Sequence, residues 1–425
     1  MVQLILWYLA ISFLGLITFP LVYYFLPALP DRGYTFIRVG GLLLWGYLFW
    51  ILGVMGFVRN DLSGLLFSFS LLFIASIWSI KKTGWEEIIA WLKGHLPVVI
   101  TAEVVFLITF LVWAFVRANN PENMGTEKPM ELAFINSILC SKTFPPHDPW
   151  LSGHSISYYY FGYVMVAMLA KLTNTSGGIA FNLGLSLIFA LSAVGVYGLL
   201  FNLLASRHRE KQHATFLAAL LGPFFTLIVS NWEGFLHYIH AQGFFWQEGE
   251  DGRMVSGFWR WLDIWDLVDP PSGNEFGHWW WWRASRIIQD VDFTGHAKEV
   301  ISEFPFFSFL LGDLHPHVLA IPFALFCVSL ALNLFLRHDT RRFRWLGLIP
   351  VRLSLPNFFI IALAVGGMSF LNTWDFPIYV AIIAGAYVLR DIFRKESEGI
   401  SLRLLLGDFI FLGLALGVTG ILLYL

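Results

Sequence analysis

Long apolar runs alternate with short polar connections along most of the chain. A membrane-spanning helix needs about 20 consecutive, mostly apolar residues, and about ten segments approach this length. They are approximately residues 3–26, 36–58, 62–80, 96–116, 179–204, 213–230, 317–336, 355–372, 376–391 and 404–425. The pattern predicts an all-α polytopic membrane protein with about ten transmembrane helices. The last apolar run reaches Leu425, so we expect the natural chain to continue.

Basic residues concentrate in five of the polar connections. These are Arg32 and Arg38; Lys81, Lys82 and Lys93; Arg207, Arg209 and Lys211; Arg337, Arg341, Arg342 and Arg344; and Arg390, Arg394, Lys395 and Arg403. Because cytoplasmic loops are enriched in Lys and Arg, all five connections should lie inside the cell. They can do so only if a further apolar run, about 156–172, does not cross the membrane.

The run 156–172 has the composition of an interfacial helix. It contains Tyr158, Tyr159, Tyr160 and Tyr163 and ends at Lys171. Tyrosines are enriched at membrane interfaces, so we predict a juxtamembrane helix lying flat on the outer surface. An ordinary short span is the alternative.

The flat helix determines the predicted organisation. N-terminal transmembrane helices occupy 1–116, and an outer loop with juxtamembrane helices occupies 117–178. A transmembrane core follows over 179–425, with a large outer loop at 231–316. Nearly all candidate chemistry then faces the extracytoplasmic side of the cell membrane.

Composition agrees with the membrane class. Hydrophobic residues form 57% of the chain and charged residues 13%, against about 25% charged in soluble domains. The net charge of −2 argues against a nucleic-acid partner. The chain lacks a Walker or Rossmann phosphate-binding motif, so an ATPase is not expected.

Glu127 and Glu131 are the first candidate catalytic residues. They stand four residues apart at the start of an expected helix and so share one face. Two such carboxylates can bind a divalent cation or divide an acid–base role. They could instead be solvated acidic residues favoured at a helix N-terminus. The same polar loop closes with candidate substrate-binding residues, His147, Asp148 and Tyr159.

Glu233 is the third candidate catalytic residue, placed at the outer end of an apolar run. It could act as a ligand or base, or pair with His237 one helical turn later. Arg283 and Arg286 follow a run of tryptophans and are candidate phosphate contacts. The turn from Asn372 to Asp375 is as well explained by turn formation as by a site.

Asp313, His315 and His317 lie within five residues at the entry to an apolar run. Pro316 disfavours helix at His315, and an extended backbone could place all three side chains on one side. Asp and His at this spacing can bind a metal or contact phosphate. Single histidines in apolar segments are more often satisfied core residues.

Four motifs in order, GTEKPMELAFINSIL, FPPHDPWLSGHSISYYYFGY, NWEG and GDLHPH, carry a family resemblance. From about residue 117 onward the chain resembles the bacterial and archaeal membrane proteins named for their Tyr-Tyr-Tyr motif. In layout that family is similar to the GT-C superfamily of membrane glycosyltransferases. Glu in place of the usual first Asp, and three extra spans ahead of the usual first one, are departures from that pattern.

The resemblance implies particular roles. Glu127 matches the acidic residue of the first outer loop, which serves as catalytic base or metal ligand, with Glu131 next to it. Glu233 matches the second acidic position. The expected donor is a sugar on a polyprenyl phosphate. The resemblance suggests metal or phosphate contact for Asp313, His315 and His317, so a divalent metal such as Mg or Mn is a possible cofactor.

These observations lead to a glycosyltransferase hypothesis, with an unknown acceptor on the outer face. A transporter or a non-enzymatic assembly factor is the alternative. The enzyme hypothesis requires the acidic and imidazole side chains to converge on one outer-facing cavity.

Overall fold

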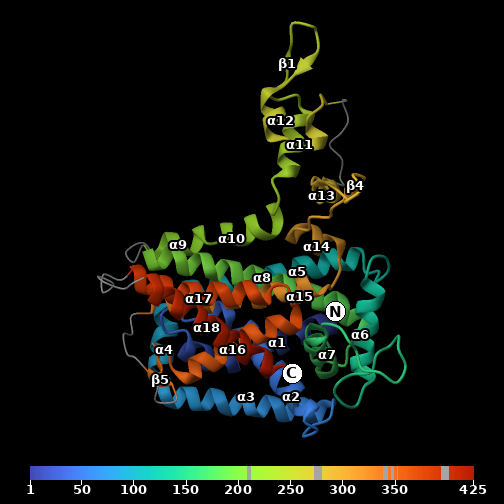
Figure 1. The fold of residues 1–425 in the computed structure, drawn as a ribbon. Helices are drawn as coiled ribbons and strands as arrows, with labels where there is room; N and C mark the ends of the chain where they lie inside the picture. Colours follow the sequence, from blue (N-terminus) through green and yellow to red (C-terminus); the bar gives the residue numbers. More distant parts are fainter. Residues whose placement is uncertain (208–211, 272–279, 338–342, 346–348, 352, 394–401) are drawn as a thin grey trace. The chain divides into compact units, whose positions relative to one another are not determined.

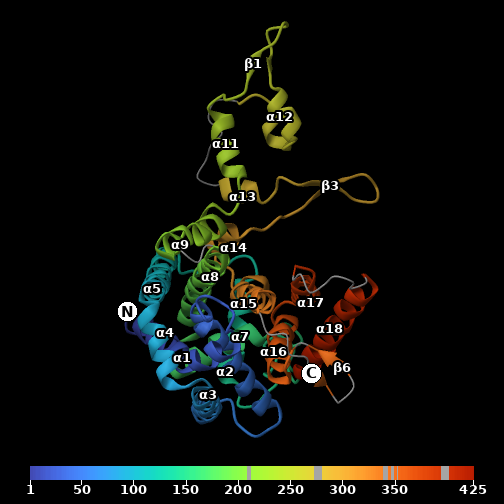
Figure 2. The ribbon, with the colours of Figure 1, turned by 90° about the vertical axis from the view of Figure 1, so that its left-hand side faces the viewer.

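The computed structural model (Figure 1, Figure 2) describes residues 1–207, 212–271, 280–337, 343–345, 349–351, 353–393 and 402–425. Within these residues the chain folds into two compact units. Unit 1 combines Met1–Pro223 with Asp313–Leu425, and unit 2 is Phe224–Gly312. The predicted chemistry is therefore divided between them: Glu127 belongs to unit 1 and Glu233 to unit 2.

Unit 1 consists almost entirely of helices, because an apolar segment in lipid must pair its own backbone groups. The helices are α1 (Val2–Phe25), η1 (Tyr34–Phe36), α2 (Ile37–Val54), α3 (Leu62–Thr83), α4 (Trp85–Gly94), α5 (Leu96–Asn119), α6 (Lys128–Cys140), α7 (Phe161–Leu172), α8 (Gly177–Arg207), α9 (Gln212–Ala218), α10 (Leu221–Pro223), α15 (Pro316–Leu336), α16 (Leu355–Leu371), α17 (Phe376–Phe393) and α18 (Leu402–Leu423). Strands β5 (Phe343–Trp345) and β6 (Ile349–Val351) pair antiparallel between α15 and α16.

Eight helices of the described chain are long and apolar enough to cross a membrane: α1, α2 with η1, α3, α5, α8, α15, α17 and α18. The predicted all-α polytopic fold is thus confirmed. Two of the ten expected spans differ. The expected span 355–372 is α16, a shorter helix of 17 residues. The expected span 213–230 is broken into α9, α10 and a π-helical segment, η2 (Phe224–Val229), and a bend separates η2 from α11 (Glu233–Ala241).

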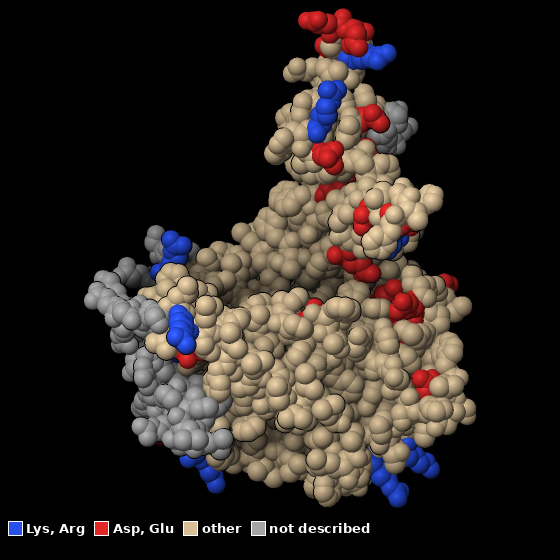
Figure 3. All heavy atoms as spheres, in the orientation of Figure 1, with Lys and Arg blue, Asp and Glu red and all other residues tan. Residues whose placement is uncertain are grey.

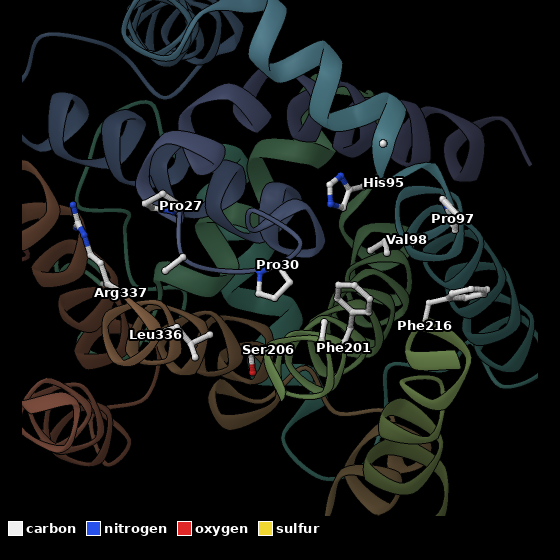
Figure 4. A pocket seen from close by; sticks show the side chains of 13 residues that line it. Pro27, Pro30, His95, Pro97, Val98, Phe201, Ser206, Phe216, Leu336 and Arg337 are labelled. Atoms are coloured by element: carbon white, nitrogen blue, oxygen red, sulfur yellow. The ribbon is translucent and has the colours of Figure 1, made fainter. Parts of the chain in front are cut away.

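The described helix ends that flank the basic connections gather at one end of unit 1. The Asp31 N–H, just after α1, donates to Asn202 Oδ1 near the end of α8 at 3.0 Å. The rings of Phe335 and Phe393 bring the ends of α15 and α17 together, with centroids 6.0 Å apart. A cavity of about 640 Å³ at this end (Figure 4) is lined by residues from four connections, including Pro27, His95, Ser206 and Arg337.

The opposite end of unit 1 carries the polar loops of the predicted outer face. Trp7 at the start of α1 donates its indole N–H to Thr175 Oγ1 at 3.2 Å. Trp50 near the end of α2 donates to the Tyr160 hydroxyl at 3.1 Å. The beginning of α1, the end of α2 and the beginning of α8 therefore meet at this end, which we call the acidic end because it contains Glu127.

Helix α7 lies across the acidic end and does not traverse the bundle. Tyr160, which precedes it, bonds to Trp50. Lys171, in its last turn, donates to the backbone oxygens of Asn60 and Leu139 at 2.9 and 3.0 Å. Both ends of this 12-residue helix thus stay at one end of unit 1. Its residues 161–170 are all buried, because α7 packs against α2, α6 and α8. It is a helix enclosed by protein, which differs from the predicted interfacial helix.

The outer surface of the bundle suits lipid. Large apolar side chains such as Leu66, Ile108 and Leu414 are exposed on α3, α5 and α18. The face of unit 1 seen in Figure 3 is almost free of charged side chains between its two ends. In water such a surface would be an interaction site or an aggregation hazard, so it is explained by contact with a membrane.

Unit 2 is a smaller, aromatic-rich assembly. Its elements are η2, α11, β1 (Gln247–Glu248), β2 (Met254–Val255), α12 (Gly257–Leu262), η3 (Trp265–Leu267), α13 (Trp280–Ala284), β3 (Gln289–Val291), β4 (Ala297–Glu299) and α14 (Pro305–Leu311). The strands form two antiparallel hairpins, β1–β2 and β3–β4. Ala284, Phe304 and Phe307 form a small core against Trp280 and Trp281.

Candidate functional site

The first half of the site is the turn that begins α6. Gly125 and Thr126 both have positive φ, at 78° and 49°. This conformation is ordinary for glycine and strained for a β-branched residue. The turn places Glu127 at the N-cap of α6 and Glu131 in its first turn. The predicted helix start is confirmed, and it directs both carboxylates toward one region.

The second half is the segment that leads into α15. His315 is the N-cap of this helix, with extended backbone (φ −64°, ψ 153°), and Pro316 is the first helical residue. Proline suits this position because its missing N–H would be unpaired there anyway. As predicted from Pro316, the backbone at His315 is extended. The segment from Asp313 to His315 therefore leads directly into the first turn of α15.

Three contacts join these two halves. Thr126 Oγ1 donates to Asp313 Oδ1 at 2.6 Å. The Leu314 N–H donates to Glu131 Oε2 at 2.8 Å. His315 Nε2 lies 2.8 Å from Glu127 Oε2. Residues far apart in the sequence are therefore held close together. Four of the predicted site residues converge at the acidic end: Glu127, Glu131, Asp313 and His315.

His317 extends this cluster as the second member of an imidazole pair. Its Nδ1 lies 2.8 Å from His315 Nδ1. Since His315 presents Nε2 to the Glu127 carboxylate, the neutral form of His315 donates from Nε2 and accepts at Nδ1. The resulting chain runs from His317 through His315 to Glu127. Such a chain fixes the tautomer of His315 and disperses the negative charge of the carboxylate.

Glu127 and Glu131 differ sharply in environment. The Glu127 side chain is 56% exposed, and it uses one carboxylate oxygen for His315. Glu131 is fully buried. Burial, reinforced by the negative charges of Asp313 and Glu127, raises the pKa of Glu131 to about 8. Glu131 is thus a neutral acid at pH 7 and Glu127 is the accessible carboxylate.

Two cations that the sequence reasoning missed adjoin the cluster. Lys128 and Arg117 are both buried, and both interact electrostatically with Asp313. Burial lowers the pKa of Lys128, and Asp313 opposes that shift. A usable signal existed for Arg117, because a charge in the last turn of a long apolar helix is costly in a membrane.

The turn from Asn372 to Asp375 also reaches the site. Burial raises the pKa of Asp375, while a hydrogen bond from Asn372 and the nearby His317 oppose the shift. The bond joins Asn372 Nδ2 to Asp375 Oδ2 at 3.0 Å. This segment therefore forms a turn and also lies near the site.

The Tyr158–Tyr160 run forms one edge of the acidic end. Tyr158 contacts Phe134 of α6, with ring centroids 5.6 Å apart. Burial raises the pKa of Tyr158, and Glu127 and Glu131 add to the shift, which places its hydroxyl near both carboxylates. Tyr159 is half-buried against Tyr158, with centroids 5.0 Å apart.

His147 and Asp148 lie in the loop between α6 and α7 and have local structural contacts. Asp148 Oδ1 accepts the N–H groups of Trp150 and Leu151 at 2.7 and 2.9 Å, as Asp does in turns. The backbone of His147 is held by Ser141 at 3.1 Å, and its side chain is exposed. Their substrate-binding role stays a prediction.

Metal binding has no preformed geometry in the described ranges. Within them, no group of three or more His, Cys, Asp or Glu side chains is arranged to hold a metal ion. His315 explains part of this, because Glu127 engages its Nε2 and His317 its Nδ1. The assignment of Asp313, His315 and His317 as metal ligands stays a prediction.

Unit 2 brings Glu233 together with Arg283. The Glu233 side chain is 1% exposed, and its Oε1 lies 3.7 Å from His237 Nδ1 and 3.8 Å from Arg283 Nε. The pairing with His237 that the spacing allowed is therefore present. Arg283 also approaches Asp266 at 3.3 Å. The predicted roles of Glu233 and Arg283 in substrate chemistry stay predictions.

Arg286 is occupied by a carboxylate of its own unit. Its Nε donates to Glu299 Oε1 at 2.7 Å, and its guanidinium lies 3.6 Å from the centre of the Trp282 ring. These contacts neutralise the charge that a phosphate would require. Its role as a phosphate contact likewise stays a prediction.

Comparison with known proteins gives one match. No curated protein and no solved structure matches the chain. A family model described as "Uncharacterized membrane protein (DUF2298)" matches residues 44–425, which include both halves of the site. With its apolar helices and nearly full-length match, the chain belongs to this family of membrane proteins.

Proposed function

We propose that this protein is a membrane glycosyltransferase that moves a sugar from a polyprenyl-phosphate donor to a hydroxyl acceptor at the acidic end of unit 1. The observation that carries the proposal is the contact between Glu127 and His315 at 2.8 Å. It gives a partly exposed carboxylate an imidazole partner that orients it, and a positioned side chain is what general-base catalysis uses. The gathering of the basic connections at the opposite end supports an outer-face location.

In the proposed reaction, Glu127 acts as the general base. The acceptor hydroxyl loses its proton to the Glu127 carboxylate while the hydroxyl oxygen forms a bond to the anomeric carbon of the sugar. The bond between that carbon and the phosphate oxygen breaks, and the lipid phosphate leaves with the electron pair. His315 stabilises the carboxylate before transfer and keeps it aimed at the acceptor. No step passes through a metal.

Glu131 has a different role in this proposal. A carboxyl with a pKa of about 8 is a poor base at pH 7 because it is already protonated. Its contact with the Leu314 N–H instead positions the segment that carries His315. The proposal therefore separates the two acidic residues into a reacting carboxylate and a positioning acid.

The test uses the full chain in proteoliposomes that contain polyprenyl-phosphate-linked glucose or mannose. Release of polyprenyl phosphate is measured, with membrane extracts supplied as acceptors. Glu127→Gln should reduce release by at least about 10²-fold. Glu122→Gln is the matched control, because Glu122 is exposed in the same loop. Transfer by the Glu127→Gln protein at the wild-type rate would exclude Glu127 as the base.

Proton-coupled transport is the second candidate, favoured by the buried, protonated Glu131 in the same cluster as His315 and His317. Ionisable residues within membrane proteins often serve as proton relays. A transporter would take up a solute into vesicles in response to a pH gradient, without consuming any lipid-linked sugar. The two functions are thus separated by whether the donor lipid is cleaved.

A further inference from the structure

An open cavity of about 510 Å³ lies beside the cluster of Glu127, Glu131, Asp313 and His315, which we call the acidic cluster. It is formed between the last turn of α5, the segment that follows it and the first turns of α8. Its described lining includes Arg117, Asn123, Ser176, Gly178, Ile179 and Asn182. The described part of the lining contains one cation, Arg117, and no carboxylate, so its charge favours an anion.

Arg117 supplies the charge of this cavity. The residue is 2% exposed, and its guanidinium contacts neutral oxygens. Its Nε donates to Asn182 Oδ1 at 2.8 Å and its Nη2 to the Glu122 backbone oxygen at 3.5 Å. Among the described residues, no carboxylate lies within ion-pair distance of this guanidinium. Asp313 interacts with Arg117 electrostatically from beyond that distance, and a buried guanidinium with no carboxylate at ion-pair distance is costly unless a ligand supplies an anion.

The N-terminus of α8 adds a second, independent source of positive potential. Ser176 is its N-cap, because the Ala180 N–H donates to the Ser176 oxygen at 2.8 Å. The first-turn N–H groups of residues 177–179 have no intrahelical acceptor, and Gly178 and Ile179 line the cavity. The aligned peptide dipoles of this 31-residue helix place partial positive charge at the same point.

We propose that this cavity binds a phosphate group, held by the Arg117 guanidinium and the N-terminus of α8. An arginine fork and helix N–H groups are the donors that recognise phosphate oxygens. The inference rests on the proposed function in one respect, since it makes the bound group the phosphate of the donor lipid. Phosphate chemistry itself follows from the cavity alone.

The position of the cavity suits departure of a phosphate from the acidic cluster. Arg117 interacts electrostatically with Asp313, which Thr126 joins to the turn that carries Glu127. Asn123, in the loop between them, donates to the Gly178 oxygen at 3.2 Å. Base and anion site are therefore connected through one short loop. A donor could place its anomeric carbon near Glu127 and its phosphate near Arg117.

The experiment measures binding to the purified full chain in nanodiscs. Titrations use two probes, polyprenyl phosphate incorporated in the nanodisc and inorganic phosphate in solution. Arg117→Gln should weaken binding by at least about tenfold, because a charge-assisted hydrogen-bond pair is lost. Arg59→Gln removes the same charge from an exposed site at the same end of the unit and should leave affinity unchanged.

A second variant protects the test against misfolding. Ser176→Asp retains a good N-cap residue at an exposed position, so the helix should form normally. Its negative charge at the helix start should repel phosphate and weaken binding by a similar factor. Wild-type affinity in a folded Ser176→Asp or Arg117→Gln protein would overturn the proposal, as would equal loss in Arg59→Gln.

These measurements test the phosphate site and the glycosyltransferase activity independently of each other. Arg117-dependent binding of polyprenyl phosphate supports the lipid as the source, and binding of inorganic phosphate alone, with the same dependence, supports a soluble phosphate. Glu127→Gln should bind either probe normally while transfer is lost. Phosphate binding without donor cleavage in the wild type would end the transferase proposal and leave the anion site in place.

Discussion

The imidazole of His315 contacts the carboxylate of Glu127 at 2.8 Å, and this contact joins the N-caps of two helices, α6 and α15. In the proposed reaction His315 acts through Glu127, so its removal should matter only while Glu127 reacts.

His315→Ala should lower kcat for donor cleavage by about 10²-fold with little change in KM, because the base loses its orienting partner. In a Glu127→Gln background the same substitution should have almost no further effect, since residues that act as a unit are not additive. Steady-state kinetics of the two single variants and the double variant measure this. Fully additive losses would contradict the coupling.

Glu131→Gln should make stability less sensitive to pH. The folded-state pKa of Glu131 is raised from 4.5 to about 8, so the folded protein binds more protons than the unfolded one between these values. Its contribution is full below about pH 4.5 and is lost as pH rises toward 8, by at most about 1.4 kcal/mol per pH unit. Melting temperatures at pH 5 and pH 8.5 measure the difference.

The Glu131→Gln variant keeps the shape of the side chain and removes only its ionisation. Its amide oxygen can still accept the Leu314 N–H, while the titrating group is absent. The melting temperature of the wild type should therefore fall more steeply between the two pH values than that of the variant. Parallel pH profiles would show that Glu131 is already ionised in the folded protein.

Thr126→Val should destabilise the turn before α6. The substitution keeps the β-branched shape and removes the hydroxyl that donates to Asp313 Oδ1 at 2.6 Å. The loss should be about 1 kcal/mol, and donor cleavage should fall because Glu127 follows directly in the chain. Thr126→Ser retains the hydroxyl and should behave like the wild type. Thermal melting and the cleavage rate distinguish these variants.

Cysteine accessibility should separate the two ends of unit 1. Cys140 is exposed and Cys327 buried, so a Cys140→Ser background is required. Trp150, in the loop between α6 and α7, is 72% exposed, and Trp85 at the start of α4 is 57% exposed. In intact cells an impermeant thiol reagent should label Trp150→Cys and leave Trp85→Cys unlabelled. The reverse pattern would place the basic connections outside.

The apolar runs determined most of the fold, because lipid permits few structures other than helices for a long uncharged segment. They predicted the eight helices that are long and apolar enough to cross a membrane, and they were wrong where an apolar run formed a short or broken helix. α16 has only 17 residues, and the segment before α11 is broken. The non-crossing path of α7 could be reasoned from loop charge. Its burial could not, because the same tyrosines suit an interface and a protein interior.

The sequence also identified Glu127, Glu131, Asp313, His315 and His317 as residues with chemistry, since ionisable side chains are rare in so apolar a chain. What only the tertiary structure decided is their division of labour. Burial made Glu131 a neutral acid, exposure left Glu127 available, and the packing of α5 against α8 gave Arg117 its cavity. Local sequence carries neither burial nor distant charge, and these two quantities set the protonation and pairing of each group.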